Sequence, residues 1–139
     1  MNLLFLCTGN SCRSQMAEAW ARHYYKDSDY HFYSAGIETH GMNPNAVAVM
    51  QEVGVDMSGH YSKTLTELSH VQFDVIFTVC AHADETCPRV DPPVKKIHVG
   101  FDDPPKLAQA AADAQAALDC YRLVRDQIRE FVISLESVI

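Results

Sequence analysis

The sequence predicts an α/β protein of one domain, built on a four-stranded parallel sheet with helices on both faces. Short apolar segments alternate with helix-like segments along the chain, which is typical of a parallel sheet wound with helices. Three of the four predicted strands end at chemically reactive residues: Cys7, Cys80, and the pair Asp102 and Asp103. In such folds ligands bind beyond the carboxyl ends of the strands, so we expect these residues to share one site.

Length and composition fit a single domain over residues 1–139. The chain is 47% hydrophobic and 21% charged, an ordinary globular balance. Its formal charge of −7, from 11 basic and 18 acidic side chains, argues against broad nucleic-acid or anionic-membrane binding, which needs a basic face. A local anion site is still compatible with this charge, because backbone amides and one arginine are enough to form it.

The N-terminus and the cysteines predict a cytoplasmic protein. No apolar stretch approaches the roughly 20 residues of a membrane span, and MNLLFLC lacks the basic flank of a signal peptide. The five cysteines are Cys7, Cys12, Cys80, Cys87 and Cys120. An odd number in a reducing compartment favours free or catalytic thiols over a disulfide scaffold.

Two strands and a helix are predicted at the start of the chain. The apolar run 2–6 is typical of a buried strand, and the alternating segment 30–34 predicts a second one. A helix is expected from Ser14 onward, because apolar residues recur there at three- and four-residue spacing. Its predicted buried face consists of Met16, Ala17, Trp20 and Tyr24.

Two further helices are predicted before the third strand. In NPNAVAVMQEVG, Asn43 is suited to cap a helix, Pro44 to its first turn, and Gly54 to its end. A shorter helix is expected over residues 63–68.

The rest of the chain supplies two strands and a long helix. DVIFTV (74–79) shows the clearest strand pattern, and KKIHV (95–99) predicts the fourth strand. Residues 108–135 favour helix throughout, with a break near Asp113. The core-facing stripe expected in its later half consists of Tyr121, Val124, Ile128, Phe131 and Leu135.

The segment after the first strand has the parts of an anion-binding loop. A strand, a glycine-containing loop and a helix start point several backbone N–H groups at one anion. Arg13 adds a planar guanidinium that matches a tetrahedral oxyanion. These groups are expected to lower the pKa of the Cys7 thiol, and Ser14 is expected to donate a hydrogen bond to its sulfur. The alternative is a buried structural cysteine beside a turn.

Three segments resemble the arsenate reductases built on the low-molecular-weight tyrosine phosphatase fold: CTGNSCRSQMAE, SAGIETHGMNPNAV and GFDDP. The resemblance covers nearly the whole chain. It implies a nucleophilic cysteine at Cys7, an arginine closing the loop at Arg13, and an aspartate general acid at Asp103, with Asp102 as the alternative proton donor. It also implies redox cysteines at Cys80 and Cys87. The implied substrate-binding residues are Thr8, Gly9, Asn10, Ser11, Cys12, Arg13 and Ser14.

Cys80 and Cys87 distinguish arsenate reduction from phosphate-ester hydrolysis, which needs neither of them. Reduction of arsenic(V) needs two electrons, which thiols supply by exchange. Cys7 forms the arsenate adduct in this hypothesis, Cys80 attacks its sulfur, and Cys87 then takes over the disulfide. AHADET lies between Cys80 and Cys87, so a disulfide joining these two cysteines closes only a short loop at little entropic cost, and the segment is polar enough to move to the surface.

Several alternatives stay open at this level. Cys80, His82 and Cys87 could bind zinc, although they lack the two-residue spacing of structural zinc sites. A tyrosine phosphatase is the second enzyme hypothesis, but no tyrosine follows DDPP to line an aryl pocket. Cys12 could form a protective disulfide with Cys7, as in similar phosphatases, or fill apolar space. No role is assigned to Cys120.

Some members of the resembled family bind potassium near the loop. The matching positions are Asn10, Glu18 and Ser34, but Lys63 stands where those members carry an aspartate. The lysine ammonium is expected to replace the cation, leaving Asn10 to hold the loop in shape.

The resulting hypothesis is a cytoplasmic arsenate reductase with no cofactor and no metal. Its expected partners are arsenate and thioredoxin as electron donor, although the sequence alone does not separate thioredoxin from glutaredoxin or glutathione. With no obvious interface stripe, a monomer is expected.

Overall fold

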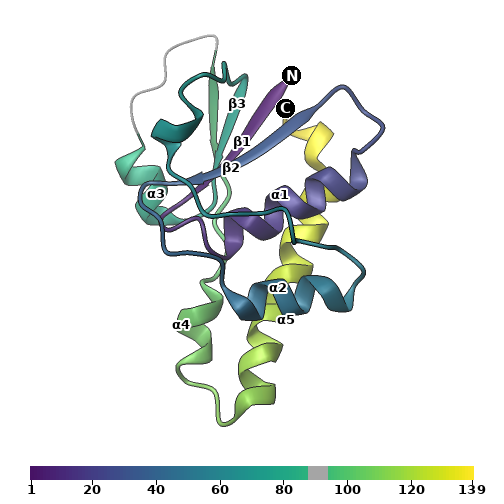
Figure 1. Ribbon diagram of the computed structural model, residues 1–139, viewed down its shortest axis with the longest axis vertical. Coiled ribbons are helices and arrows are strands. Elements are labelled where there is room, and N and C mark those ends of the chain that lie inside the picture. Colours follow the sequence, from purple (N-terminus) through teal and green to yellow (C-terminus); the bar gives the residue numbers. More distant parts are fainter. Residues whose placement is uncertain (88–93) are drawn as a thin grey trace.

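The centre of the molecule is a four-stranded sheet in which every neighbouring pair of strands is parallel. Figure 1 shows the computed structural model, which describes residues 1–87 and 94–139. The strands are β1 (Asn2–Cys7), β2 (His31–Gly36), β3 (Val75–Thr78) and β4 (Lys95–His98), in the spatial order β2-β1-β3-β4. The chain moves outward from β1 to β2 and then returns to the other side of β1, so the switch point lies between β1 and β3.

Five α-helices connect and cover these strands in the described part of the chain. They are α1 (Arg13–Tyr24), α2 (Pro44–Glu52), α3 (Ala81–Thr86), α4 (Pro104–Ala108) and α5 (Ala114–Ile133). Short 3-10 helices cover Leu65–Leu68 and Leu135–Ser137. The predicted fold class is confirmed.

Aromatic packing joins the sheet to the C-terminal helix. Phe5 of β1 stacks on Phe77 of β3 with ring centroids 5.4 Å apart, and Phe131 of α5 meets Phe77 edge-on at 5.5 Å. Trp20 of α1 donates its indole N–H to the carbonyl of Arg125 in α5 at 3.1 Å. Consecutive residues of β1 are buried, so both faces of the central strand are covered, as a continuous apolar run predicts. This packing fixes the carboxyl ends of β1 and β3 side by side.

The predicted helix boundaries are confirmed where capping residues mark them. The Asn43 side chain accepts hydrogen bonds from the backbone of Asn45 and Ala46 at the start of α2, and Gly54 follows with φ of +80°. The break near Asp113 is real, because its carboxylate caps α5 by accepting from Ala116 N–H at 2.8 Å.

Two local predictions are wrong, and one helix was not predicted. The helix expected over 63–68 is a 3-10 turn beginning only at Leu65. Tyr24, expected on the buried face of α1, is exposed at the last residue of that helix. AHADET forms helix α3, which Cys80 caps and whose alanines favour helix although it has no apolar stripe. Leu135 lies beyond the end of α5 but is fully buried, as predicted.

None of the helices in the described residues is both long enough and apolar enough to cross a membrane.

Candidate active site

The loop between β1 and α1 is held open by its neighbours, which bind its carbonyl groups. The carbonyls of Cys7, Thr8 and Gly9 accept hydrogen bonds from the backbone N–H groups of Ile37, Glu38 and His40 at 2.9–3.1 Å. Because these carbonyls are bound on one side, the loop's own N–H groups are left for a ligand on the other. No supporting role was predicted for this segment, although it lies directly after the second predicted strand and within SAGIETHGMNPNAV, which carries part of the family resemblance.

Asn10 fixes the shape of the loop from inside. It is fully buried and adopts φ of +49°, a left-handed conformation that is uncommon outside glycine. The oxygen of its side-chain amide accepts hydrogen bonds from the Gln15 side chain at 2.8 Å and from the Lys63 backbone N–H at 2.9 Å. The nitrogen of the same side-chain amide donates to the Ser14 hydroxyl at 2.9 Å. The hydrogen bond expected from Ser14 to Cys7 does not occur among the contacts of the described residues, and Ser14 instead contacts Asn10. Asn10 therefore takes the shaping role predicted for it.

A cavity of about 270 Å³ opens above this loop. Its lining consists of Cys7, Thr8, Gly9, Ser11, Cys12, Arg13, His40, Asp103 and Pro105. Five of the seven predicted substrate-binding residues therefore surround one space, and the other two, Asn10 and Ser14, are buried and hydrogen-bonded to each other. His40 was not predicted to be there.

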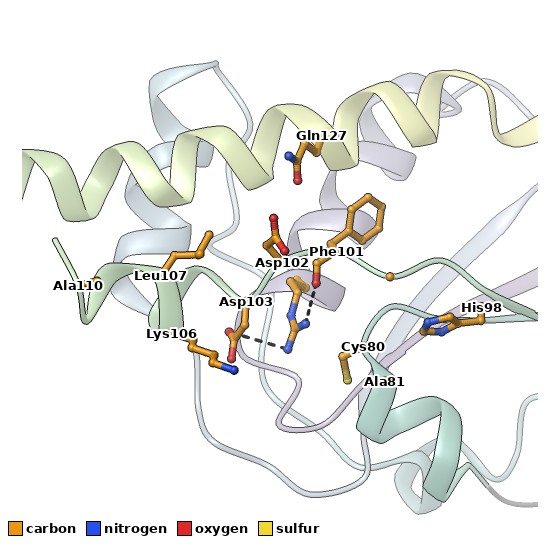
Figure 2. A pocket seen from close by; sticks show the side chains of 12 residues that line it. Cys80, Ala81, His98, Phe101, Asp102, Asp103, Lys106, Leu107, Ala110 and Gln127 are labelled. Carbon is orange, nitrogen blue, oxygen red and sulfur yellow. Dashed lines mark hydrogen bonds and ion pairs between the residues drawn. The ribbon is translucent and has the colours of Figure 1, made fainter.

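Arg13 and Asp103 meet at the rim of this cavity. The Arg13 guanidinium donates to the carbonyl of Phe101 at 2.9 Å and lies 3.8 Å from the Asp103 carboxylate (Figure 2). Asp103 precedes α4 but makes no side-chain capping bond, so its carboxylate faces the site instead. Asp102 is exposed and lines a second cavity of about 1000 Å³, which also borders Arg13 and Cys80. The geometry thus favours Asp103 over Asp102 as the residue beside the anion loop.

Two of the predicted redox sulfurs are in contact. The thiol of Cys7 donates to the sulfur of Cys80 at 3.7 Å, and Thr8 Oγ1 lies 3.3 Å from the Cys80 sulfur. The Ala83 N–H also donates to Cys80 at 3.4 Å. The switch point between β1 and β3 therefore brings together sulfurs 73 residues apart in the chain.

This contact changes the expected ionisation of the nucleophile. The hydrogen bond that Cys7 donates to Cys80, together with burial, raises the pKa of the Cys7 thiol, and the positive charge of Arg13 opposes this only in part. The same bond, helped by those from Thr8 and Ala83, lowers the pKa of Cys80. The pKa shifts in the free protein therefore run opposite to the expected lowering at Cys7, and Cys80 is the more acidic of the two thiols.

Cys87 is not brought to this cluster. It is half-buried at the C-terminal end of α3, and burial raises its pKa. Cys80 and Cys87 are seven residues apart across a helix that rises about 1.5 Å per residue, so their Cα atoms are separated by roughly 10 Å. A disulfide needs about 4.4–6.8 Å between Cα atoms.

The remaining cysteines are free thiols. Cys12 is buried in the loop itself, directly before α1, where it lines the cavity, and burial raises its pKa to about 12. Cys120 is half-buried on α5 and donates to the Ala116 carbonyl at 3.4 Å. Among the described residues, no three side chains of histidine, cysteine, aspartate or glutamate lie close enough together to hold a metal ion. Cys80, His82 and Cys87 therefore do not form a zinc site in this structure.

A buried charge cluster lies behind the loop. Lys63 Nζ is 3.9 Å from the Glu18 carboxylate and donates to the Tyr61 carbonyl at 3.2 Å. Glu18 also accepts from the Ser34 hydroxyl at 2.5 Å and pairs with Arg22 at 2.8 Å. Burial lowers the pKa of Lys63, and the Glu18 charge counters that effect. The side chain of Lys63 thus lies among the residues that the resemblance assigns to a cation.

Fold and site together define a class of protein. A cysteine that opens an anion-binding loop after the first strand of a four-stranded parallel sheet, with an arginine closing the loop and an aspartate above it, is the arrangement of phosphatase-like proteins that attack oxyanions with sulfur. The family model for low molecular weight phosphotyrosine protein phosphatase matches residues 2–137. The chain therefore belongs to this family.

Within this family, the chain is similar to individual proteins named arsenate reductase. The chain is 46% identical to an arsenate reductase of Halalkalibacterium halodurans over 126 residues, which cover 91% of this chain and 88% of that protein. A solved arsenate reductase in its reduced state is 30% identical and superimposes with a TM-score of 0.70, over 96% of this chain and 95% of that one. A low molecular weight protein tyrosine phosphatase from T. tengcongensis superimposes with a TM-score of 0.77, over 100% of this chain and 99% of that one. Its sequence is 23% identical, so this similarity shows the fold alone.

Proposed function

We propose that this protein is an arsenate reductase that uses Cys7, Cys80 and Cys87 in that order. The observation that carries the proposal is the 3.7 Å contact between the sulfurs of Cys7 and Cys80. Hydrolysis of a phosphate ester needs one nucleophilic cysteine, an arginine and an acid, and has no use for a second thiol at this point. Two relatives named arsenate reductase, which are 46% and 52% identical to this chain, support arsenate as the substrate.

In the first step Cys7 attacks arsenate held by the loop amides and Arg13. The Cys7 proton passes along the existing hydrogen bond to the Cys80 thiolate as the sulfur–arsenic bond forms. One arsenate oxygen leaves as water after Asp103 donates a proton to it. Arg13 must turn from Asp103 and Phe101 toward the anion, and a doubly charged arsenate supplies a stronger bidentate partner than a carboxylate 3.8 Å away.

In the second step Cys80 reduces the adduct. Its proton is lost to water through the 1000 Å³ cavity that it borders, and Thr8 and Ala83 stabilise the resulting thiolate. The thiolate attacks the Cys7 sulfur, the sulfur–arsenic bond breaks, and its electron pair stays on arsenic, which leaves as arsenite. A Cys7–Cys80 disulfide remains.

In the third step Cys87 attacks the Cys80 sulfur and Cys7 leaves as a thiolate. Because α3 keeps the two cysteines about 10 Å apart, this step requires the helix to unwind. The expectation that a polar AHADET segment moves is therefore retained, but the starting state of that movement is a helix.

The proposal also covers the electron donor, the cell compartment and the oligomeric state. A Cys80–Cys87 disulfide on an unwound, polar segment suits a protein dithiol such as thioredoxin, which we propose as the electron donor. Five free thiols suit a reducing compartment, so we also propose a cytoplasmic location. We propose a monomer, because the sequence has no obvious interface stripe.

Single-turnover arsenite release, with disulfides mapped by mass spectrometry, tests the relay. Cys7→Ser should not react with arsenate, because a serine hydroxyl is not appreciably ionised at neutral pH. Cys80→Ser should form the adduct without releasing arsenite by the internal route. Cys87→Ser should complete one turnover and stop with Cys7 joined to Cys80, and Cys120→Ser serves as the control that should cycle normally.

Two results would contradict the proposal. If Cys87→Ser cycles with thioredoxin like the unmodified protein, the third step is wrong. If arsenate is never reduced while an aryl phosphate is hydrolysed rapidly, the phosphatase hypothesis replaces this one.

A further inference from the structure

Helix α3 is attached to the protein by little apolar surface. It has six residues, and Ala83 alone among them is buried. Isolated helices shorter than about 12 residues are marginal in water, so a segment of this length needs tertiary contacts to remain helical. The contacts that hold it are therefore polar ones.

Asp84 makes the main polar attachment in the middle of α3. Lys96 of β4 contacts it twice, donating to the Asp84 backbone carbonyl at 3.1 Å and lying 3.2 Å from its carboxylate. The hydroxyl of Thr78 in β3 donates to the same carboxylate at 3.1 Å. Because that hydroxyl has a single proton, the His98 Nδ1 at 3.0 Å from it acts as donor to Thr78. Figure 2 shows His98 on the strand beside the start of α3.

Cys80 makes the second attachment, at the N-terminal end of α3. Its sulfur accepts a hydrogen bond from the Ala83 N–H at 3.4 Å and caps the helix. A thiolate is a good acceptor for such a bond, and a disulfide sulfur carries no charge and is a weak one. Formation of the Cys7–Cys80 disulfide therefore weakens this attachment, and the contacts of Asp84 remain.

We propose that Asp84 and Lys96 are positioning residues that form a latch, which keeps α3 helical while Cys80 faces Cys7 and sets how fast Cys87 can reach Cys80. This inference deepens the relay proposed above and rests on it. When the latch is closed, Cys80 is held for the second step. When it opens, α3 unwinds and the third step follows.

Closure of the Cys80–Cys87 disulfide can be measured without arsenate. In a Cys7→Ser, Cys120→Ser background, one equivalent of dithiodipyridine reacts with Cys80 or Cys87, giving a mixed disulfide and one aryl thiolate. The other cysteine then attacks the protein sulfur of that mixed disulfide, the sulfur–sulfur bond to the aryl group breaks, and a second aryl thiolate leaves. The protein loses two electrons to the reagent, and the absorbance of the second thiolate gives the closure rate.

Lys96→Met removes both contacts with Asp84 and should speed closure about threefold to tenfold, the change expected for losing a partly exposed, charge-assisted pair. Asp84→Asn weakens the same contacts and should speed it at least about twofold. Lys96→Arg keeps the charge and the donors and should restore slow closure. Lys95→Met is the matched control, because Lys95 is a neighbouring exposed lysine of β4 that donates to Val138 instead.

The two latch variants also separate this proposal from a simple charge effect. The Lys96 charge lowers the pKa of Cys87 and the Asp84 charge raises it. If charge alone mattered, Lys96→Met would slow closure and Asp84→Asn would speed it. The latch predicts that both speed closure, and that in both the amide hydrogens of α3 exchange faster with solvent in the reduced protein.

The outcomes are distinct. Opposite signs for the two variants, or closure in Lys96→Met at the rate of Lys95→Met, would overturn the latch whether or not arsenate is reduced. Failure of the protein to reduce arsenate, with both variants closing faster, would overturn the proposed function and leave the latch standing. In active protein, Lys96→Met should also release arsenite no faster than the unmodified chain, since the second step needs the helix intact.

Discussion

Lys63 places an ammonium group in a pocket of opposite charge, 3.9 Å from the buried carboxylate of Glu18. The lysine side chain is 8% exposed and its backbone N–H also holds Asn10, so the same residue reaches the charge cluster and the anion loop. A bound monovalent cation is unnecessary at this position as long as the lysine is protonated. Its pKa is lowered by burial, but Glu18 counters the shift.

We therefore expect turnover and melting temperature to be indifferent to potassium in the unmodified protein. Lys63→Met leaves Glu18 with Arg22 as its cationic partner and should cost about 2 kcal/mol. Potassium should restore part of that loss, because a ligand that binds only the native state raises its stability. The measurement is melting temperature in potassium chloride against a bulky organic cation at equal ionic strength, with Lys26→Met as the exposed-lysine control. A several-fold potassium-specific gain in the unmodified protein would rule out this role for Lys63.

At the scale of elements, the end of β2 shapes the anion loop although it does not line the cavity. Gly36 donates its N–H to the Lys63 carbonyl at 2.8 Å, and a side-chain carbon at this position would collide with the carbonyl of Glu38. A side-chain carbon there would also lie 2.8 Å from the Thr8 carbonyl and 2.9 Å from the Asn10 nitrogen, both backbone atoms of the loop. These atoms cannot give way without moving the N–H groups that face the ligand.

Gly36→Ala should thus impair anion binding from outside the site. We expect a loss of stability of about 1–3 kcal/mol from overpacking, and weaker protection of Cys7 against alkylation by sulfate. Gly59→Ala is the matched control, since a side chain there meets nothing within 4 Å. Equal sulfate protection in the two variants would show that the close approach at Gly36 does not set the loop geometry.

Helix α3 matters for the mechanism and is an element that was not predicted from the sequence. AHADET is polar and has no apolar periodicity, so the pattern that predicts helices is absent. Its helical state depends on a cap from Cys80 and on the side chains of Thr78 and Lys96, which lie 6 and 12 residues from Asp84 in the sequence. Contacts of that kind are invisible to local patterns.

At the scale of the whole molecule, one core should unfold as a unit. Trp20 is the sole tryptophan, is buried, and bonds to α5, which also packs against α2 and α4. We expect Trp20 fluorescence and far-ultraviolet circular dichroism to give the same urea midpoint, as for a single domain of this size. Phosphate should raise both midpoints equally by binding the native state. Separated midpoints would contradict the single domain predicted over residues 1–139.

The sequence alone was enough to predict the parallel sheet and those helix ends that a capping residue marks. Each strand carries its own apolar pattern, and Asn43, Gly54 and Asp113 mark helix boundaries by chemistry confined to a few neighbouring residues. The family resemblance also pointed to Cys7, Arg13 and Asp103, and the strand ends made a shared site with Cys80 an expectation. All of these depend on short-range signals or on the rule that parallel strands end at one edge.

Only the tertiary structure decided which of the two thiols is the more acidic and which hydrogen bonds each of them makes. Cys7 was expected to be the thiolate from its loop, yet the sulfur of Cys80 approaches to 3.7 Å and takes the hydrogen bond. Ser14 turns to Asn10 rather than to Cys7, and Cys87 stays at the far end of a helix. The physical reason is the same in each case: ionisation and hydrogen bonding depend on atoms that come together only when distant strands pair and exclude water between them.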